Sequence, residues 1–193
     1  MSIPVELILL TLPSIVYAMV QRERKRTWRG ILERIGWRGC SPVFMAWALG
    51  FAVVLGGLGV LAVQAVPSTV LHGRNVSASY YAGWTRGPGT FLLAWAREAL
   101  YAALGGEVFF RGLLGGWLVR RFGFQIGNAL QAAAFLLPHL LLLVVSLTFW
   151  PLVVVQGLAG WLLGWLRYRS DSILPGWFAH SLVNALGALV SMR

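Results

Sequence analysis

Six long apolar stretches constrain the fold of this chain more than any other feature. Each is close to the roughly 17–25 residues that an α-helix needs to cross about 30 Å of hydrocarbon. The fifth is short and the third is long, so we expect the third to break or bend near its glycine residues. The stretches cover residues 3–20, 42–66, 90–119, 124–149, 151–166 and 173–190.

The composition agrees with a membrane protein. Of 193 residues, 58% are hydrophobic and 11% are charged, whereas a soluble domain averages about 25% charged residues. The chain is too apolar to be disordered, and a single cysteine excludes a disulfide scaffold. We therefore predict an all-α, polytopic integral membrane bundle of about six transmembrane helices, with residues 1–193 forming a single membrane domain.

The basic excess of 16 Lys and Arg over 6 acidic residues has two interpretations. It can indicate nucleic-acid binding, but cytoplasmic loops of membrane proteins also collect basic residues. If both termini lie outside, the following eleven fall in the inner segments: Arg22, Arg24, Lys25, Arg26, Arg29, Arg34, Arg38, Arg120, Arg121, Arg167 and Arg169. We therefore predict no nucleic-acid partner and a bacterial plasma-membrane protein whose basic loops are cytoplasmic and whose first partner is the lipid bilayer.

The N-terminal part, residues 1–66, contains a basic segment between its two spans. Trp28, Ile31, Leu32 and Ile35 fall at i, i+3, i+4 and i+7, and arginines occupy most positions around them. This spacing predicts one amphipathic helix that lies in the membrane interface.

Polar side chains inside membrane spans are costly, so each is a candidate functional residue. Glu107 and Arg111 are separated by four residues and share a helix face, as do His180 and Asn184. His139 follows a proline within the fourth stretch, while His72 falls in a predicted outer loop and is not assigned to a site.

Two imidazoles and a carboxylate can hold Zn²⁺ with an open position for water. Alternatively, a carboxylate and a histidine activate water directly while other polar groups stabilise an oxyanion. Spacing does not choose between these chemistries.

Three short motifs resemble those of the CPBP intramembrane proteases, also called the CAAX protease or Abi family. Residues 106–112 read Gly-Glu-Val-Phe-Phe-Arg-Gly, residues 135–139 read Phe-Leu-Leu-Pro-His, and residues 180–184 read His-Ser-Leu-Val-Asn. The resemblance covers a core of about residues 90–192. It implies an all-helical intramembrane endopeptidase, similar to the type II CAAX prenyl endopeptidases, whose substrate is a membrane-associated peptide or protein, either prenylated or bacteriocin-like.

The resemblance also implies roles for the site residues. Catalysis is expected near the cytoplasmic face, with His139 helping to activate water and His180 and Asn184 supporting the oxyanion or the water. Glu107 and Arg111 match the second glutamate and the arginine of the first motif, which the resemblance makes structural. We nevertheless expect Glu107 to be catalytic, in place of the first glutamate, with Arg111 supporting it. The glutamate-protease interpretation requires no cofactor, whereas the metalloprotease interpretation places Zn²⁺ on Glu107, His139 and His180.

One departure from the family pattern concerns the first motif. The family has two adjacent glutamates, and the first, which is assigned as general base, is Gly106 here. Adjacent helical residues point about 100° apart, so Glu107 replaces it only if the helix is locally distorted, which the Gly105–Gly106 pair allows. The alternative function is a non-catalytic pseudoprotease that acts as a membrane binding, immunity or regulatory partner. A small transporter is a third class, and the sequence assigns no oligomeric state.

Overall fold

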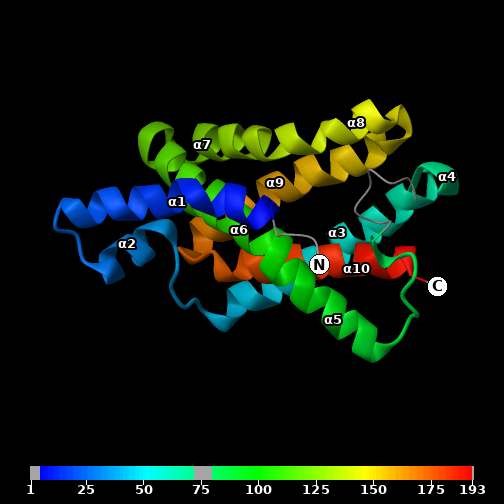
Figure 1. Cartoon of the computed structure of the whole chain (residues 1–193). Coiled ribbons are helices and arrows are strands. Elements are labelled where there is room, and N and C mark those ends of the chain that lie inside the picture. Colours follow the sequence, from blue (N-terminus) through cyan, green and yellow to red (C-terminus); the bar gives the residue numbers. More distant parts are fainter. Residues whose placement is uncertain (1–4, 72–79, 193) are drawn as a thin grey trace.

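The computed structural model describes residues 5–71 and 80–192, and this part of the chain is helical without any strand (Figure 1). The predicted all-α fold is confirmed. The described elements are α1 (Val5–Glu23), α2 (Trp28–Ile35), α3 (Pro42–Gln64), α4 (Ser68–Leu71), α5 (Pro88–Glu98), η2 (Ala99–Ala103), α6 (Leu104–Gly106), η3 (Glu107–Gly115), α7 (Gly116–His139), α8 (Leu141–Val145), η4 (Leu147–Phe149), α9 (Trp150–Ser170) and α10 (Leu174–Ser191).

Three continuous helical segments of the described chain are long and apolar enough to cross a membrane: Pro42–Gln64, Pro88–Val145 and Leu147–Ser170. Large apolar side chains on all three remain exposed, among them Val53, Val144 and Val154. Apolar surface of this extent is covered in soluble proteins and faces lipid in membrane proteins. The chain is therefore a helical membrane protein, while the count of six spans stays a prediction.

The segment Pro88–Val145 contains the third and fourth predicted spans. We expected a break or bend near the glycines within residues 90–119, and the structure has no break there. The backbone stays helical and widens into the π-helical turns η2 and η3, whose N–H groups bond the carbonyl five residues back. The chain reverses at Gly123, with φ 76° and ψ 170°, and Figure 1 shows α7 turning back there. Glycine adopts a positive φ without a Cβ clash.

Small side chains allow the C-terminal helices to pack closely. α3, α9 and α10 share a buried cluster of Ala48, Ala52, Leu163, Leu166 and Ala179. Small residues at helix contacts let the backbones approach, which is the main source of helix association in lipid.

Polar side chains join α7 to α9. Asn128 donates to the carbonyl of Trp161 at 3.1 Å, and Gln131 donates to the carbonyl of Gly160 at 2.7 Å. Both side chains are almost fully buried. In an apolar environment, such bonds to backbone carbonyls fix how the two helices face each other.

The predicted amphipathic helix is present as α2. Thr27 caps its start by accepting from the Gly30 N–H at 3.1 Å, and Ile31 and Ile35 are buried, whereas Trp28 and Leu32 are exposed. Half of the apolar stripe therefore packs on the protein and half is free for the membrane interface. That interfacial position stays a prediction.

The loop that follows α2 is attached to the turn between α9 and α10. The N–H of Ile173 donates to the carbonyl of Gly36 at 2.9 Å. Ser172 donates its hydroxyl to the carbonyl of Arg38, and the Arg38 side chain pairs with Asp171. Two segments more than 130 residues apart in sequence are thus held together.

Gly164 is expected to be essential for the contact between α7 and α9. A Cβ there would overlap Asn128 Oδ1 and lie 2.5 Å from Gln131 Nε2, so Gly164→Ala should cost about 1–3 kcal/mol through overpacking. The measurement is the thermal unfolding midpoint of the detergent-purified protein. The control is Gly157→Ala on the same helix, where a Cβ meets nothing nearer than 3.7 Å. Equal midpoints for the two variants would contradict this packing.

Candidate active site

Glu107 is a fully buried carboxylate at the first residue of η3. Its Oε1 atom lies 3.0 Å from Nδ1 of His180 on α10 and 3.2 Å from Nη1 of Arg111. Its Oε2 atom has no hydrogen-bond partner in the described part of the chain. A Cβ on Gly176 would lie 2.7 Å from that oxygen, so α10 can pass this closely only because glycine stands there. One carboxylate oxygen is therefore shared by a guanidinium and an imidazole.

Arg111 has lost nearly all its water contacts, with 1% of the residue exposed. The ion pair with Glu107 does not have hydrogen-bond geometry, and no guanidinium nitrogen has a hydrogen-bond partner among the described residues. The guanidinium carbon lies 4.0 Å from the centroid of the Phe135 ring. The carboxylate and the aromatic face together compensate the buried charge.

Phe135 on α7 contacts both histidines of the site. Its ring centroid lies 4.6 Å from that of His139 and 5.8 Å from that of His180. His139 Nδ1 is 2.8 Å from the Phe135 carbonyl oxygen. A carbonyl oxygen only accepts, so this bond places the His139 proton on Nδ1 and leaves its Nε2 free. By the same reasoning, the Glu107 carboxylate places the His180 proton on Nδ1.

Asn184 does not join Glu107, His139 and His180. Its amide donates to Oε2 of Glu98 at 3.4 Å. Glu98 in turn accepts from the Tyr81 hydroxyl and pairs with Arg97 at 2.9 Å. A second polar cluster therefore lies one turn along α10 from His180. It gives structural partners to Arg97 and Glu98, the two intramembrane charges whose role the sequence does not explain.

Tyr81 anchors the second cluster from the segment before α5. It is 3% exposed, and burial, followed by its hydrogen bond to Glu98, raises the pKa of its hydroxyl above the ordinary value. Arg97 also places its guanidinium carbon 4.0 Å from the Tyr80 ring centroid. The tyrosine hydroxyl therefore remains a neutral donor to the carboxylate.

The three proposed zinc ligands do not form a metal site in the described residues. Glu107 reaches His180, yet no group of three or more His, Cys, Asp or Glu side chains there could hold a metal ion. His72 lies outside the described residues. The geometry provides a carboxylate–imidazole pair rather than a three-ligand centre.

Gly106 leaves room beside His180. A Cβ at this position would lie 3.5 Å from His180 Cε1 and 4.0 Å from its Nδ1, which is ordinary van der Waals contact. A side chain at residue 106 would therefore project next to the imidazole that Glu107 holds. The site lacks the first glutamate of the family pattern, and the backbone at residue 106 leaves room for a Cβ beside His180.

Two polar residues near the site were missed by sequence reasoning. Asn128 and Gln131 are almost fully buried, and Gln131 also donates to Asn128 Oδ1 at 3.0 Å. They lie three residues apart in the apolar stretch 124–149. This i, i+3 spacing was the signal that could have marked them as a shared polar face.

Comparison with protein families agrees with this arrangement. A family model described as type II CAAX prenyl endopeptidase Rce1-like matches residues 88–186, about half of the chain. The chain belongs to this Rce1-like family. The suspected relationship to the CAAX proteases is confirmed, and the protein is of a membrane-protease kind. The searches of curated proteins and of solved structures found no match. The matched region includes Glu107, His139, His180 and Asn184 but excludes α1, α2 and α3.

Removing the Glu107 carboxylate is expected to destabilise the bundle. Glu107→Ala leaves the buried Arg111 charge without its counter-ion, which typically costs about 3–5 kcal/mol. The double variant Glu107→Ala/Arg111→Met removes both charges and should recover part of the loss. Thermal midpoints in detergent measure both effects. A double variant no more stable than Glu107→Ala would show that the ion pair is not the cause.

Proposed function

We propose that the protein is an intramembrane endopeptidase that hydrolyses a peptide bond of a membrane-associated substrate, prenylated or bacteriocin-like, near the basic end of the bundle. The observation that carries the proposal is the bond between buried Glu107 and His180 Nδ1. A carboxylate in this position sets the imidazole tautomer and stabilises the imidazolium that forms when the ring accepts a proton. The family supports the reaction class.

In the proposed mechanism, His180 is the general base. Its free Nε2 takes a proton from water as the water oxygen attacks the peptide carbonyl carbon. The proton then passes to the leaving amine nitrogen as the C–N bond breaks. His139 offers a second free Nε2 on the other histidine that contacts Phe135, and it orients the water. Glu107 is a positioning residue, because it acts through His180.

This assignment differs from the roles implied by the family resemblance. There, a glutamate at position 106 would be the base, and Asn184 would help to hold the oxyanion. Gly106 has no carboxylate, and the Asn184 amide is bonded to Glu98. The first observation supports His180 as the base, and the second is the reason that the proposal gives Asn184 no oxyanion role.

The histidine variants test the proposed site. His180→Ala should lower kcat for a membrane-tethered peptide by about 10²–10⁴-fold, the usual contribution of a general base, and His139→Ala should also lower kcat, because the attacking water loses the group that orients it. Asn184→Ala should lower it far less, because this side chain belongs to the second cluster. Unchanged cleavage in both histidine variants would remove the site assignment, and a full loss in Asn184→Ala would favour the oxyanion role.

The positioning role of Glu107 predicts a particular kinetic pattern. Glu107→Gln should lower kcat while KM stays within about twofold, since only transition-state stabilisation is lost. Glu107→Asp keeps the charge and should restore part of kcat. Steady-state kinetics on the same peptide separate these effects. A rise in KM alone would instead place Glu107 in substrate binding.

The alternative function, a non-catalytic membrane binding or regulatory partner, rests on Gly106. Because a Cβ at residue 106 meets His180 only at ordinary van der Waals distance, Gly106→Ala should be tolerated and is the matched control for Gly106→Glu, with thermal midpoints to show that both variants are folded. If the wild type is a peptidase, cleavage should be comparable in wild type and Gly106→Glu. Cleavage that appears only in Gly106→Glu would favour the pseudoprotease.

A further inference from the structure

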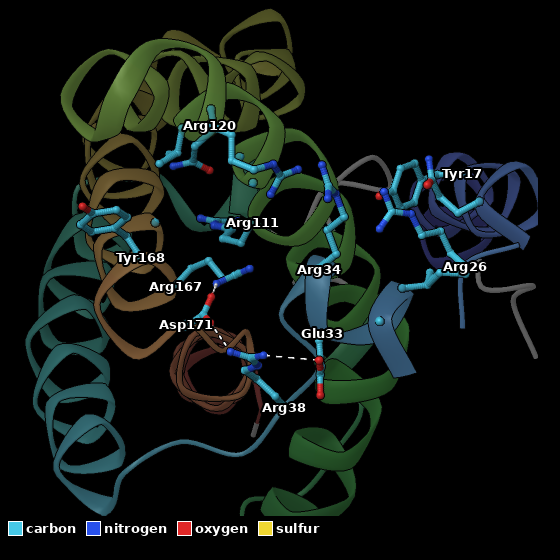
Figure 2. A pocket seen from close by; sticks show the side chains of 18 of the residues that line it. Tyr17, Arg26, Glu33, Arg34, Arg38, Arg111, Arg120, Arg167, Tyr168 and Asp171 are labelled. Carbon is cyan, nitrogen blue, oxygen red and sulfur yellow. Dashed lines mark hydrogen bonds and ion pairs between the residues drawn. The ribbon is translucent and has the colours of Figure 1, made fainter. Parts of the chain in front are cut away.

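A strongly basic pocket of about 690 Å³ opens at the end of the bundle where α1, α2, η3, α7 and α9 meet. Seven Lys and Arg side chains line it, against two acidic ones. Figure 2 shows Arg34, Arg111, Arg120 and Arg167 around one common space. These residues come from four different elements, so the fold concentrates positive charge that is dispersed along the sequence.

The two acidic residues of this basic pocket are already engaged. Asp171 pairs with Arg38 and with Arg167, the latter at 2.9 Å. Glu33 pairs with Arg29 at 2.8 Å. No carboxylate of the described residues pairs with Arg34 or Arg120. The positive charges of Arg34 and Arg167 also lie close enough to Arg120 to repel its charge. The pocket therefore has an excess of positive charge that the described residues do not neutralise.

The inner wall of the basic pocket contains buried donors without acceptors. Arg111 lines it with a side chain that is essentially unexposed, and its three guanidinium nitrogens lack hydrogen-bond partners in the described chain. Nε of Arg167 is also buried there without a partner. Buried donors that stay unsatisfied cost about 1–3 kcal/mol each. These two guanidinium groups add positive charge to the inner wall, which an anionic group in the pocket would compensate.

A second hollow of about 370 Å³ adjoins the basic pocket. It shares Tyr17, Gln21, Arg34 and Arg120 with the basic pocket and adds an apolar lining of Phe109, Leu113, Leu114 and Trp117. The two hollows together place a cationic space beside a partly apolar one. This is the pattern expected for an amphiphile rather than for a soluble anion.

We propose that the basic pocket binds the phosphate head group of an anionic lipid, with the first part of its hydrocarbon chain in the adjoining apolar hollow. A phosphomonoester head group carries about −1.5 to −2 charge and three acceptor oxygens at pH 7, so it accepts from more guanidinium groups at once than one carboxylate does. The site goes beyond the proposed peptidase function and does not rest on it. The residues contributed by α1 and α2 lie outside the region that matches the family.

The test compares four soluble probes on the detergent-purified full chain by thermophoresis: dioctanoyl phosphatidic acid, dioctanoyl phosphatidylcholine, inorganic phosphate, and a peptide with a free C-terminal carboxylate. Phosphatidic acid should bind, and its affinity should fall with added salt because salt screens the charges. The other probes should bind at least about tenfold more weakly, which corresponds to about 1.4 kcal/mol.

Matched double variants locate the binding. Arg34→Gln/Arg120→Gln should weaken phosphatidic acid binding by about tenfold or more, since charge-assisted hydrogen bonds are lost. Arg24→Gln/Arg121→Gln removes the same two charges from exposed positions outside the pocket and should change affinity less than about twofold. Thermal midpoints without lipid show that both proteins are folded, as expected for changes at exposed residues.

Four results would overturn the proposal. Inorganic phosphate that binds as tightly as phosphatidic acid would indicate a soluble anion. Phosphatidylcholine that binds equally would indicate general lipid affinity. Equal losses of affinity in both double variants would show that the lipid does not bind in the basic pocket. Tight binding of the carboxylate peptide alone would show that the basic pocket binds substrate instead. None of these variants alters Glu107 or His180, so failure of the lipid site leaves the peptidase tests unaffected.

Discussion

The Glu107 carboxylate, buried among apolar helices, is the constraint on which the centre of this bundle depends. An ionised carboxylate away from water must be compensated by charge and by hydrogen bonds. Arg111 provides the counter-charge, and His180 provides the hydrogen bond. Gly176 allows α10 to approach closely enough for that bond. The positions of η3, α7 and α10 around Phe135 follow from these requirements.

α10 contributes residues to two polar clusters. Because the clusters are separate, each has its own carboxylate and its own chemistry. His180 belongs to the Glu107 system, while Asn184, one turn later, belongs to the system of Glu98 and Tyr81. Two carboxylates near one helix would repel if they shared a site. Here each has its own cation, Arg111 or Arg97. The catalytic proposal therefore rests on one carboxylate and its histidine.

The all-helical fold was predicted from the sequence, because long apolar stretches indicate helices directly. The spacing of Glu107 and Arg111 placed both side chains on one helix face, where the structure pairs them, whereas the catalytic roles of the site residues stay a prediction. The π-helical turns leave no mark on apolar periodicity, so the sequence predicted a break or bend within residues 90–119 where the structure has π-helical turns. The reversal at Gly123 falls between the third and fourth predicted stretches. Tyr81, the partner of Glu98, lies 17 residues away in an irregular segment, and no local pattern connects the two.

The basic pocket could not be predicted for a related reason. Counting basic residues along the chain identified which segments share one end of the bundle, and this was enough for a topology prediction. It could not show that Arg34 and Arg120 border one space, because that depends on how α2 packs against α1 and η3. Binding sites built from distant segments become visible only when helix packing is known.

The bonds between the loop after α2 and the turn before α10 have a mechanical consequence. The Ile173 N–H, the Ser172 hydroxyl and the Asp171 carboxylate all bind groups of residues 36–38. The base of the helix that carries His180 is therefore anchored to the N-terminal third of the chain. A shift of either segment would strain these bonds to the other. The position of the His180 imidazole therefore depends on residues that take no part in its proposed chemistry.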